Sequence, residues 1–203
     1  MTTRLLAFLL IAGMALPASA ETREPVNPVH VSASASDVSA AQPVRKMTRA
    51  EKKALAKAQA EAEAARAALK ASVKRASMLK PVKGRIWCVP FAREASGIQL
   101  KGNAGTWWGK AAGLYNRSRL PQVGAVMNFA SSRKMPMGHV AVVSNILDSR
   151  RIQIDHANWV RNKVTLDQTV IDVSEANDWS QVRVVNADGS LGRVNPVHGF
   201  ISN

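Results

Sequence analysis

The sequence predicts an α+β domain over residues 81–203, in which a short helix is followed by β-strands. Residues 89–96 place apolar side chains along one side, with a proline in the first turn and Gly97 at the end, which is typical of a short helix. Farther along the chain, residues 138–146 and 151–159 are rich in β-branched side chains and are separated by the polar stretch LDSR. This pattern predicts an antiparallel hairpin.

Residues 1–20, at the start of the chain, have the features of a secretory signal peptide. An early arginine precedes a short apolar run, and Pro17 and the small-residue triplet ASA follow it, which predicts cleavage before Glu21. The apolar run is shorter than the roughly 20 residues that a membrane span needs. We therefore expect an exported protein, periplasmic or extracellular, with no transmembrane segment in its mature form. Residues 21–46 have no sustained period and are predicted to form a disordered linker.

Residues 47–80 are predicted to form an Ala-rich basic helix. Strong helix formers fill this segment, and Thr48 and Glu51 make a capping-box pair at its start. Leu55 and Leu69 lie two heptads apart, but small residues occupy the other seam positions, where a coiled coil prefers larger side chains. We therefore favour a lone, solvated helix over a dimerising one, and a monomeric protein.

The formal net charge of +14 is concentrated in residues 45–85, in this helix and its flanks. No recognisable nucleic-acid motif accompanies the charge, so we expect no nucleic-acid partner. A solvated helical face is the simplest explanation of the excess. The alternative is a non-specific contact with anionic cell-wall polymers, which an exported basic segment would attract.

Cys88 is the single cysteine of the chain. In an oxidising compartment structural cysteines come in pairs, so an unpaired one is an intermolecular bridge, a packing residue or a reactive thiol. Cys88 lies at the start of the predicted helix, where free N–H groups and the helix dipole favour the thiolate. The dipole supplies up to about 2 kcal/mol, whereas lowering a thiol pKa by about two units takes roughly 2.7 kcal/mol. A reactive Cys88 therefore needs a base.

His139 and His156 are the candidate bases. His139 opens the first strand of the predicted hairpin and His156 lies near the end of the second, so antiparallel pairing brings them together. Because side chains alternate along a strand, His156 and Asn158 can face His139, whereas Asp155 cannot. A bulge at this point would reverse that choice. The spacing of these residues fits no zinc signature, and we expect neither a metal nor a cofactor.

The stretches WCVPFAR, GNAGTWW, PQVGAVMNF, GHVAVVS and DHANW, in this order, resemble the CHAP domain. This family comprises cysteine- and histidine-dependent amidohydrolases/peptidases related to the NlpC/P60 enzymes, and the resemblance covers about residues 81–186. It implies a papain-like fold, with the nucleophile's helix packed on an antiparallel sheet or small barrel. It also implies cleavage of amide bonds in peptidoglycan peptides, with Cys88 as the nucleophile and His139 as the general base.

The sequence departs from the family pattern at the third catalytic position. Many CHAP domains carry Glu two residues before an Asn-Trp pair, and here that position is His156, before Asn158 and Trp159. The related NlpC/P60 enzymes resemble this arrangement, since they use a polar residue such as His there. We therefore expect a catalytic set of Cys88, His139 and His156, with Asn158 assisting through a hydrogen bond. In this set His139, oriented by His156, holds Cys88 as a thiolate pair.

Three tryptophans are candidate substrate contacts. Trp107 and Trp108 lie in a predicted helix, and because helical neighbours point about 100° apart, we expect at least one of them in the core. The other, with Trp159, is expected to line a substrate groove. The alternative to an enzyme is a non-enzymatic envelope protein that binds peptidoglycan and uses the basic helix as an interaction segment. A thiol redox protein is disfavoured, because the chain has no resolving cysteine.

Overall fold

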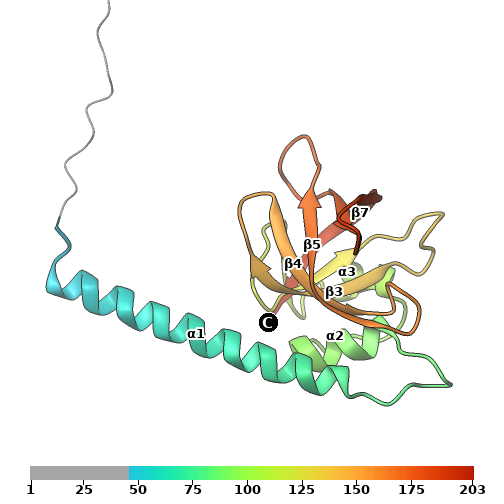
Figure 1. Ribbon diagram of the computed structural model, residues 1–203, viewed down its shortest axis with the longest axis horizontal. Helices are drawn as coiled ribbons and strands as arrows, with labels where there is room; N and C mark the ends of the chain where they lie inside the picture. The colour runs from blue at the N-terminus through green and yellow to red at the C-terminus, as the bar shows by residue number, and fades with distance from the viewer. Residues whose placement is uncertain (1–45) are drawn as a thin grey trace, which may run out of the picture. The chain divides into compact units, whose positions relative to one another are not determined.

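The computed structural model describes residues 46–203 (Figure 1). The predicted signal peptide, and the predicted linker up to residue 45, lie outside the described residues. The helical elements are α1 (Arg49–Ser77), α2 (Cys88–Ser96), the 3-10 turn η1 (Ala104–Thr106) and α3 (Trp107–Lys110). The strands are β1 (Asn116–Ser118), β2 (Val126–Phe129), β3 (His139–Ile146), β4 (Arg151–Ala157), β5 (Val164–Asp172), β6 (Gln181–Val185) and β7 (Leu191–Ser202).

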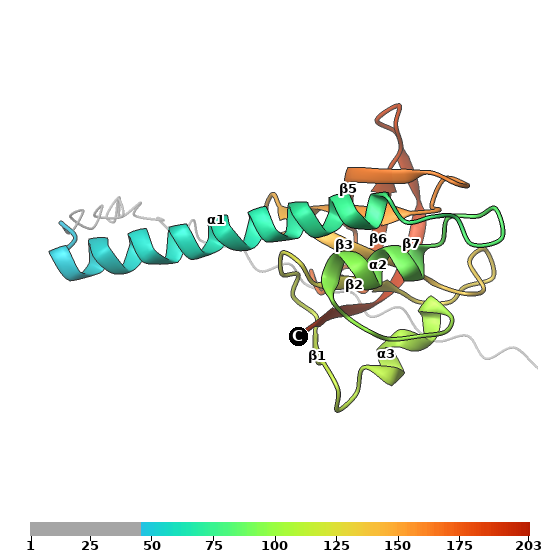
Figure 2. The same cartoon turned by 90° about the horizontal axis from the view of Figure 1, so that it is seen from below.

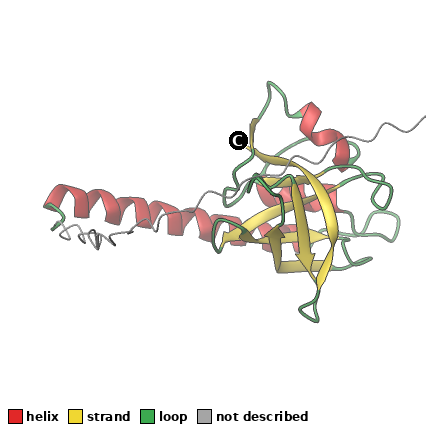
Figure 3. Cartoon of the chain, turned by 90° about the horizontal axis from the view of Figure 1, so that it is seen from above, coloured by secondary structure: helices red, strands yellow, loops and turns green. Residues whose placement is uncertain are grey.

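The strands form a closed antiparallel barrel. Their order in the sheet is β1-β7-β2-β3-β4-β5-β6, and β7 pairs with β6 as well as with β2. Strands β2 to β7 therefore form a closed barrel, and β1 is an extra strand that pairs with the last residues of β7. Figure 3 shows the strands curving into this barrel, with the helices outside it. Helices packed on an antiparallel sheet or small barrel were predicted, and of these two alternatives the structure has the barrel.

Two hydrophobic cores lie on the two faces of the barrel wall, because successive side chains of a strand point to opposite faces. The barrel interior is filled by residues such as Met127, Phe129, Ile154, Trp179 and Phe200. The outer face of β2, β3 and β4 packs against α2 through residues such as Val126, Val140, Ala157, Phe91 and Ala92. This outer core fixes α2 on the barrel wall, with its N-terminus beside the start of β3.

Helix α1 begins as predicted, with a complete capping box between Thr48 and Glu51. Its end, however, is not solvated. Val73 and Ala76 are buried in the same core as α2, and Arg75 Nε donates to Glu94 Oε1 at 3.1 Å. Figure 2 shows this end of α1 running beside α2. The prediction of a lone helix is therefore wrong for its last turns, where the small side chains allow α2 to approach closely.

Candidate active site

Cys88 is the first residue of α2 and is half-buried, with a free thiol. The N-cap residue Trp87 makes no side-chain capping bond, and Pro90 has no N–H group. The first-turn donors are therefore the backbone N–H groups of Cys88 and Val89. Gly97 ends the helix in the left-handed conformation, with a φ of 78°, as predicted.

His139 is held at the start of β3 by a tightly packed turn. Gly138 precedes it with a φ of 66°, and a Cβ at that position would collide with the backbone of Gly105 and with the carbonyl oxygen of Phe129. The N–H of Gly105 also donates to the carbonyl of Met137 at 2.8 Å. Because only glycine fits this conformation and this space, the turn leaves His139 little freedom.

The hairpin brings the two histidines together, as predicted. Strands β3 and β4 pair antiparallel, and His139 Nε2 lies 3.0 Å from His156 Nδ1. Both residues are buried, at 5 % and 0 % exposure. Trp159 packs against the two rings, with centroid distances of 5.1 Å to His139 and 5.7 Å to His156. The imidazole pair is thus held by a hydrogen bond and an aromatic wall.

His156 and Asp155 face opposite sides of the sheet, which agrees with strand alternation. Ile154 and His156 point to the barrel interior, while the Asp155 carboxylate accepts a hydrogen bond from the N–H of Asp167 at 2.8 Å. A register shift does occur here, but the extra residue is on β5 opposite Asp155. The alternation of β4 is therefore kept, and the condition that would have reversed the choice of His156 does not apply.

Burial sets the protonation states of the site. It raises the pKa of the Cys88 thiol, although the backbone N–H groups of Val140, Cys88 and Val89 oppose this effect. Burial also lowers the pKa of His139 well below its usual value, with a further contribution from His156, and lowers the pKa of His156 to about 4. The resting site therefore holds a thiol and two neutral imidazoles. Desolvation therefore outweighs the helix dipole at Cys88 and favours the thiol over the resting thiolate pair that the sequence predicts.

Asn158 does not make the expected hydrogen bond to the histidines. Its Oδ1 accepts from the N–H of Asn162 at 3.0 Å, and its own N–H donates to the carbonyl of Lys163. The strand ends at Ala157, and Asn158 has a φ of 63°. The alternation of faces therefore stops before Asn158, whose side chain closes the following turn instead.

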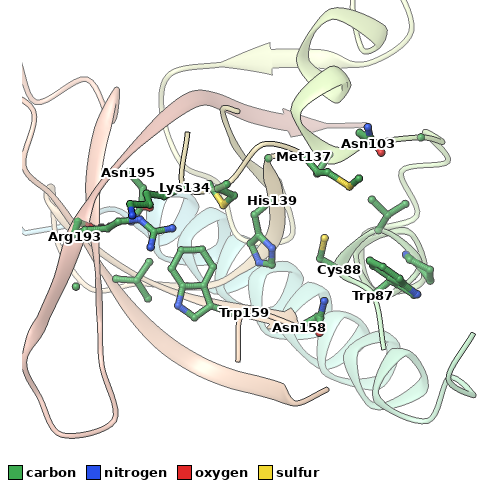
Figure 4. A pocket seen from close by; sticks show the side chains of 18 of the residues that line it. Trp87, Cys88, Asn103, Lys134, Met137, His139, Asn158, Trp159, Arg193 and Asn195 are labelled. Carbon is green, nitrogen blue, oxygen red and sulfur yellow. Dashed lines mark hydrogen bonds between the residues drawn. The ribbon is translucent and has the colours of Figure 1, made fainter. Parts of the chain in front are cut away.

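A cavity of about 950 Å³ opens over Cys88 and His139 (Figure 4). The two side chains project into the same space, although no hydrogen bond joins them within residues 46–203. The rest of the lining includes Trp87, Lys134, Met137, Asn158, Trp159, Arg193 and Asn195. Within the described chain no aspartate or glutamate lines this cavity, so its charged lining residues are cations.

Of the three tryptophans predicted to contact substrate, only Trp159 lines this cavity. Trp107 is fully buried in the core against α2. Trp108 stacks on His198, with ring centroids 6.2 Å apart, and lies under the guanidinium of Arg117. Trp107 is therefore the member of the pair that was expected in the core, and it is not a substrate contact. The prediction that the other member lines the cavity is wrong, because packing of α3 turns Trp108 away from it. Trp87 lines it instead, and its place next to Cys88 was a usable signal.

Gln168 contacts His156, although no sequence motif marks it as a site residue. His156 Nε2 lies 2.6 Å from Gln168 Oε1, and Gln168 Nε2 donates to the carbonyl of Val185 at 2.9 Å. Gln168 lies on β5, and the extra residue of that strand shifts its register against β4. No sequence signal marks such a shift in advance.

Within residues 46–203, no group of three or more His, Cys, Asp or Glu side chains is arranged to hold a metal ion. No helix among these residues is long and apolar enough to cross a membrane.

The model of the CHAP domain family matches residues 80–158, which confirms the resemblance seen in the sequence. The matched segment includes Cys88, His139 and His156 but ends before Gln168. A comparison with curated proteins finds no match.

Proposed function

Since residues 80–158 carry a CHAP domain, a family of hydrolases that act on peptidoglycan, we propose that this protein is a cysteine amidase or endopeptidase that cleaves peptidoglycan peptides. One observation carries the proposal. A free thiol at a helix N-terminus shares a cavity with a buried, hydrogen-bonded histidine pair. A nucleophile beside a base that is itself oriented by a third group is the arrangement of nucleophilic catalysis.

The first half of the reaction forms an acyl-enzyme. His139 takes the thiol proton of Cys88 as the sulfur attacks the amide carbonyl carbon, so the charge pair forms only with the attack. The N–H groups of Cys88 and Val89, which no capping side chain occupies, stabilise the resulting oxyanion. The imidazolium of His139 then protonates the leaving nitrogen, and the C–N bond breaks to release an amine and leave a thioester on Cys88.

The second half releases the acyl group. A water molecule, deprotonated by His139, adds to the thioester carbonyl, and the same N–H groups stabilise the second oxyanion. The C–S bond then breaks, the sulfur regains its proton from His139, and a carboxylic acid leaves. His156 keeps the ring of His139 oriented throughout, through the 3.0 Å contact between Nε2 and Nδ1.

The charge of the cavity favours substrates that bear carboxylates. Lys134 and Arg193 line the side of the cavity away from Cys88 (Figure 4). Because no acidic side chain of the described chain lines this space, a peptide carboxylate would be the partner of these cations. We therefore infer that acidic stem peptides are preferred over neutral ones.

The test is incubation of the protein with purified peptidoglycan, followed by mass spectrometry of the released fragments. We expect fragments with one new amine and one new carboxyl terminus for each cut. Cys88→Ala should release none and Cys88→Ser almost none, because a hydroxyl is the weaker nucleophile. Asp155→Asn, on the other face of the sheet, is the matched control and should release fragments like the wild type. Release by Cys88→Ala would overturn the proposal, and binding without release would favour the non-enzymatic alternative.

We also propose that the protein acts outside the cytoplasm, where peptidoglycan lies. The proposal is supported by the signal-peptide features of residues 1–20 and by the CHAP match. Protein recovered from the cell envelope should begin at Glu21 by N-terminal sequencing. Recovery of the uncleaved chain from the cytoplasm alone would contradict export.

A further inference from the structure

We propose that Gln168 is a positioning residue that sets the tautomers of both histidines, so that His139 keeps the lone pair of Nδ1 free for the proton of Cys88. The catalytic consequence rests on the proposed function, but the tautomers themselves do not. The inference starts from the chain of contacts Val185–Gln168–His156–His139, which runs from β6 through β5 and β4 to β3.

The orientation of the Gln168 amide is settled by its far end. Gln168 Nε2 lies 2.9 Å from the carbonyl oxygen of Val185, an atom that can only accept a hydrogen bond. The amide nitrogen therefore points to β6, and Oε1 points to His156. Since the two ends of a glutamine amide differ only in this respect, one carbonyl partner is enough to assign them.

The Gln168 carbonyl oxygen then fixes the proton of His156. It lies 2.6 Å from His156 Nε2, and because it can only accept, His156 Nε2 must carry the hydrogen. Burial lowers the pKa of His156 to about 4, so the ring is neutral at neutral pH. A neutral ring protonated on Nε2 has a lone pair on Nδ1, and this nitrogen is therefore an acceptor.

The His156 tautomer in turn fixes the proton of His139. Its Nε2 lies 3.0 Å from His156 Nδ1, which can only accept, so His139 Nε2 carries the hydrogen. Burial holds the pKa of His139 well below its usual value, and the ring is neutral. Its Nδ1 is then the one nitrogen that can take a proton. Figure 4 shows this ring and the Cys88 side chain projecting into one cavity.

Without Gln168, nothing fixes which of the two histidines donates the hydrogen bond between them. A carboxylate at position 156 would always accept from His139, whereas a histidine accepts or donates according to its tautomer. If His156 carried its hydrogen on Nδ1, His139 Nε2 would have to accept, and His139 Nδ1 would hold the proton that it needs to lose. Gln168 thus lets a neutral His156 do what the glutamate of many CHAP domains does.

The direct test is NMR of the protein labelled with ¹⁵N-histidine, which distinguishes protonated from unprotonated ring nitrogens. At neutral pH we expect the Nε2–H tautomer at both His139 and His156. Gln168→Met keeps the approximate shape without an acceptor, so His156 should become a mixture of tautomers. Gln168→Glu keeps an acceptor oxygen and should retain the Nε2–H form. Gln153→Met is the matched control, because Gln153 lies on the other face of β4, and it should leave both tautomers unchanged.

Activity provides the second readout. Gln168→Met should lower kcat by about 10-fold to 100-fold, the range found when the hydrogen-bond partners of metal-ligating histidines are changed, with KM nearly unchanged. Gln168→Glu should lose less than Gln168→Met. A single Nε2–H tautomer in Gln168→Met together with wild-type kcat would overturn the inference, as would an Nδ1–H tautomer at His156 in the wild type. The wild-type spectrum decides even if a variant fails to fold. Expected tautomers in a protein that cleaves no peptidoglycan would refute the proposed function and leave this inference standing.

Discussion

Asp155 and His156 are neighbouring titratable residues on opposite faces of β4, and their side chains make different kinds of contact. Both are buried, and burial moves each toward its neutral form, raising the pKa of Asp155 to about 6 and lowering that of His156 to about 4. His156 contacts the side chains of His139 and Gln168 inside the barrel. Asp155 instead accepts from the backbone N–H of Asp167 on the outer face. Similar burial therefore surrounds the proposed catalytic pair on one face and a backbone contact on the other.

The outer face also lies opposite helix α1. A groove of about 780 Å³ separates them, lined by Asp155 and Leu166 of the sheet and by Leu69, Lys70 and Val73 of α1. Substitutions on the inner face should therefore change the reaction, and substitutions on the outer face should change the free energy of unfolding. Each prediction below tests that division.

The largest effect is expected from His156→Ala. Loss of the group that orients the base should lower kcat by about a hundredfold or more, while Asp155→Asn should stay within about twofold of the wild type, since substitutions away from the working groups have small effects. Initial rates on one peptidoglycan preparation measure both, with far-UV circular dichroism to show that each variant is folded. A greater loss in Asp155→Asn than in His156→Ala would break the division between the faces.

A smaller effect is expected at the cationic end of the cavity. The double change Lys134→Ala with Arg193→Ala should raise KM for an acidic stem peptide by about tenfold, equivalent to about 1.4 kcal/mol, and leave kcat nearly unchanged. Arg133→Ala is the matched control, because Arg133 is exposed but does not line the cavity. The same peptide with its carboxylates amidated should not discriminate between the variants. An equal rise in KM for the amidated peptide would refute the charge argument.

On the outer side, Val73→Ala should lower the free energy of unfolding by about 1–2 kcal/mol, because two buried methyl groups are lost from the contact between α1 and α2. Leu55→Ala, in the exposed part of the same helix, should change it much less. Urea unfolding followed by circular dichroism measures both, and kcat per folded molecule should not change. Equal stabilities of the two variants would contradict the packing of α1 on α2 and support the lone helix that the sequence predicts.

The features that the sequence predicts well are those that depend on residues close together in the chain. The capping box of Thr48 and the end of α2 at Gly97 are local. The meeting of His139 and His156 follows from one short hairpin, whose loop fixes which strand ends lie together. Strand alternation within β4 was then enough to separate His156 from Asp155.

Features that depend on distant packing could not be predicted in the same way. The contact of Gln168 with His156 requires the extra residue on β5, and nothing near Asp167 announces it. The orientation of Trp108 is set by its stacking on His198, which lies on the last strand. Val73 and Ala76 suit both a solvated helix and a close helix contact, so their burial depends on where α2 lies.

The smallest predicted effect concerns the pH dependence of stability through Asp155. Burial, with a contribution from the Asp167 charge, raises the pKa of Asp155 from 3.8 to about 6 in the folded protein. The folded state therefore binds this proton more tightly than the unfolded state does, and its stabilising effect is complete below about pH 3.8 and lost as the pH rises through about 6.

Asp155→Asn stays neutral at every pH, and its amide oxygen can still accept from the N–H of Asp167. The Tm of Asp155→Asn relative to the wild type should therefore rise between about pH 4 and pH 7, the window set by these two pKa values. Thermal unfolding of both proteins across this range measures the difference, with Asp188→Asn, at an exposed turn, as the control. A Tm difference that is flat or falls with pH would show that folding does not raise the pKa of Asp155. Burial would then shift the pKa of His156 on one face of β4 but not that of Asp155 on the other.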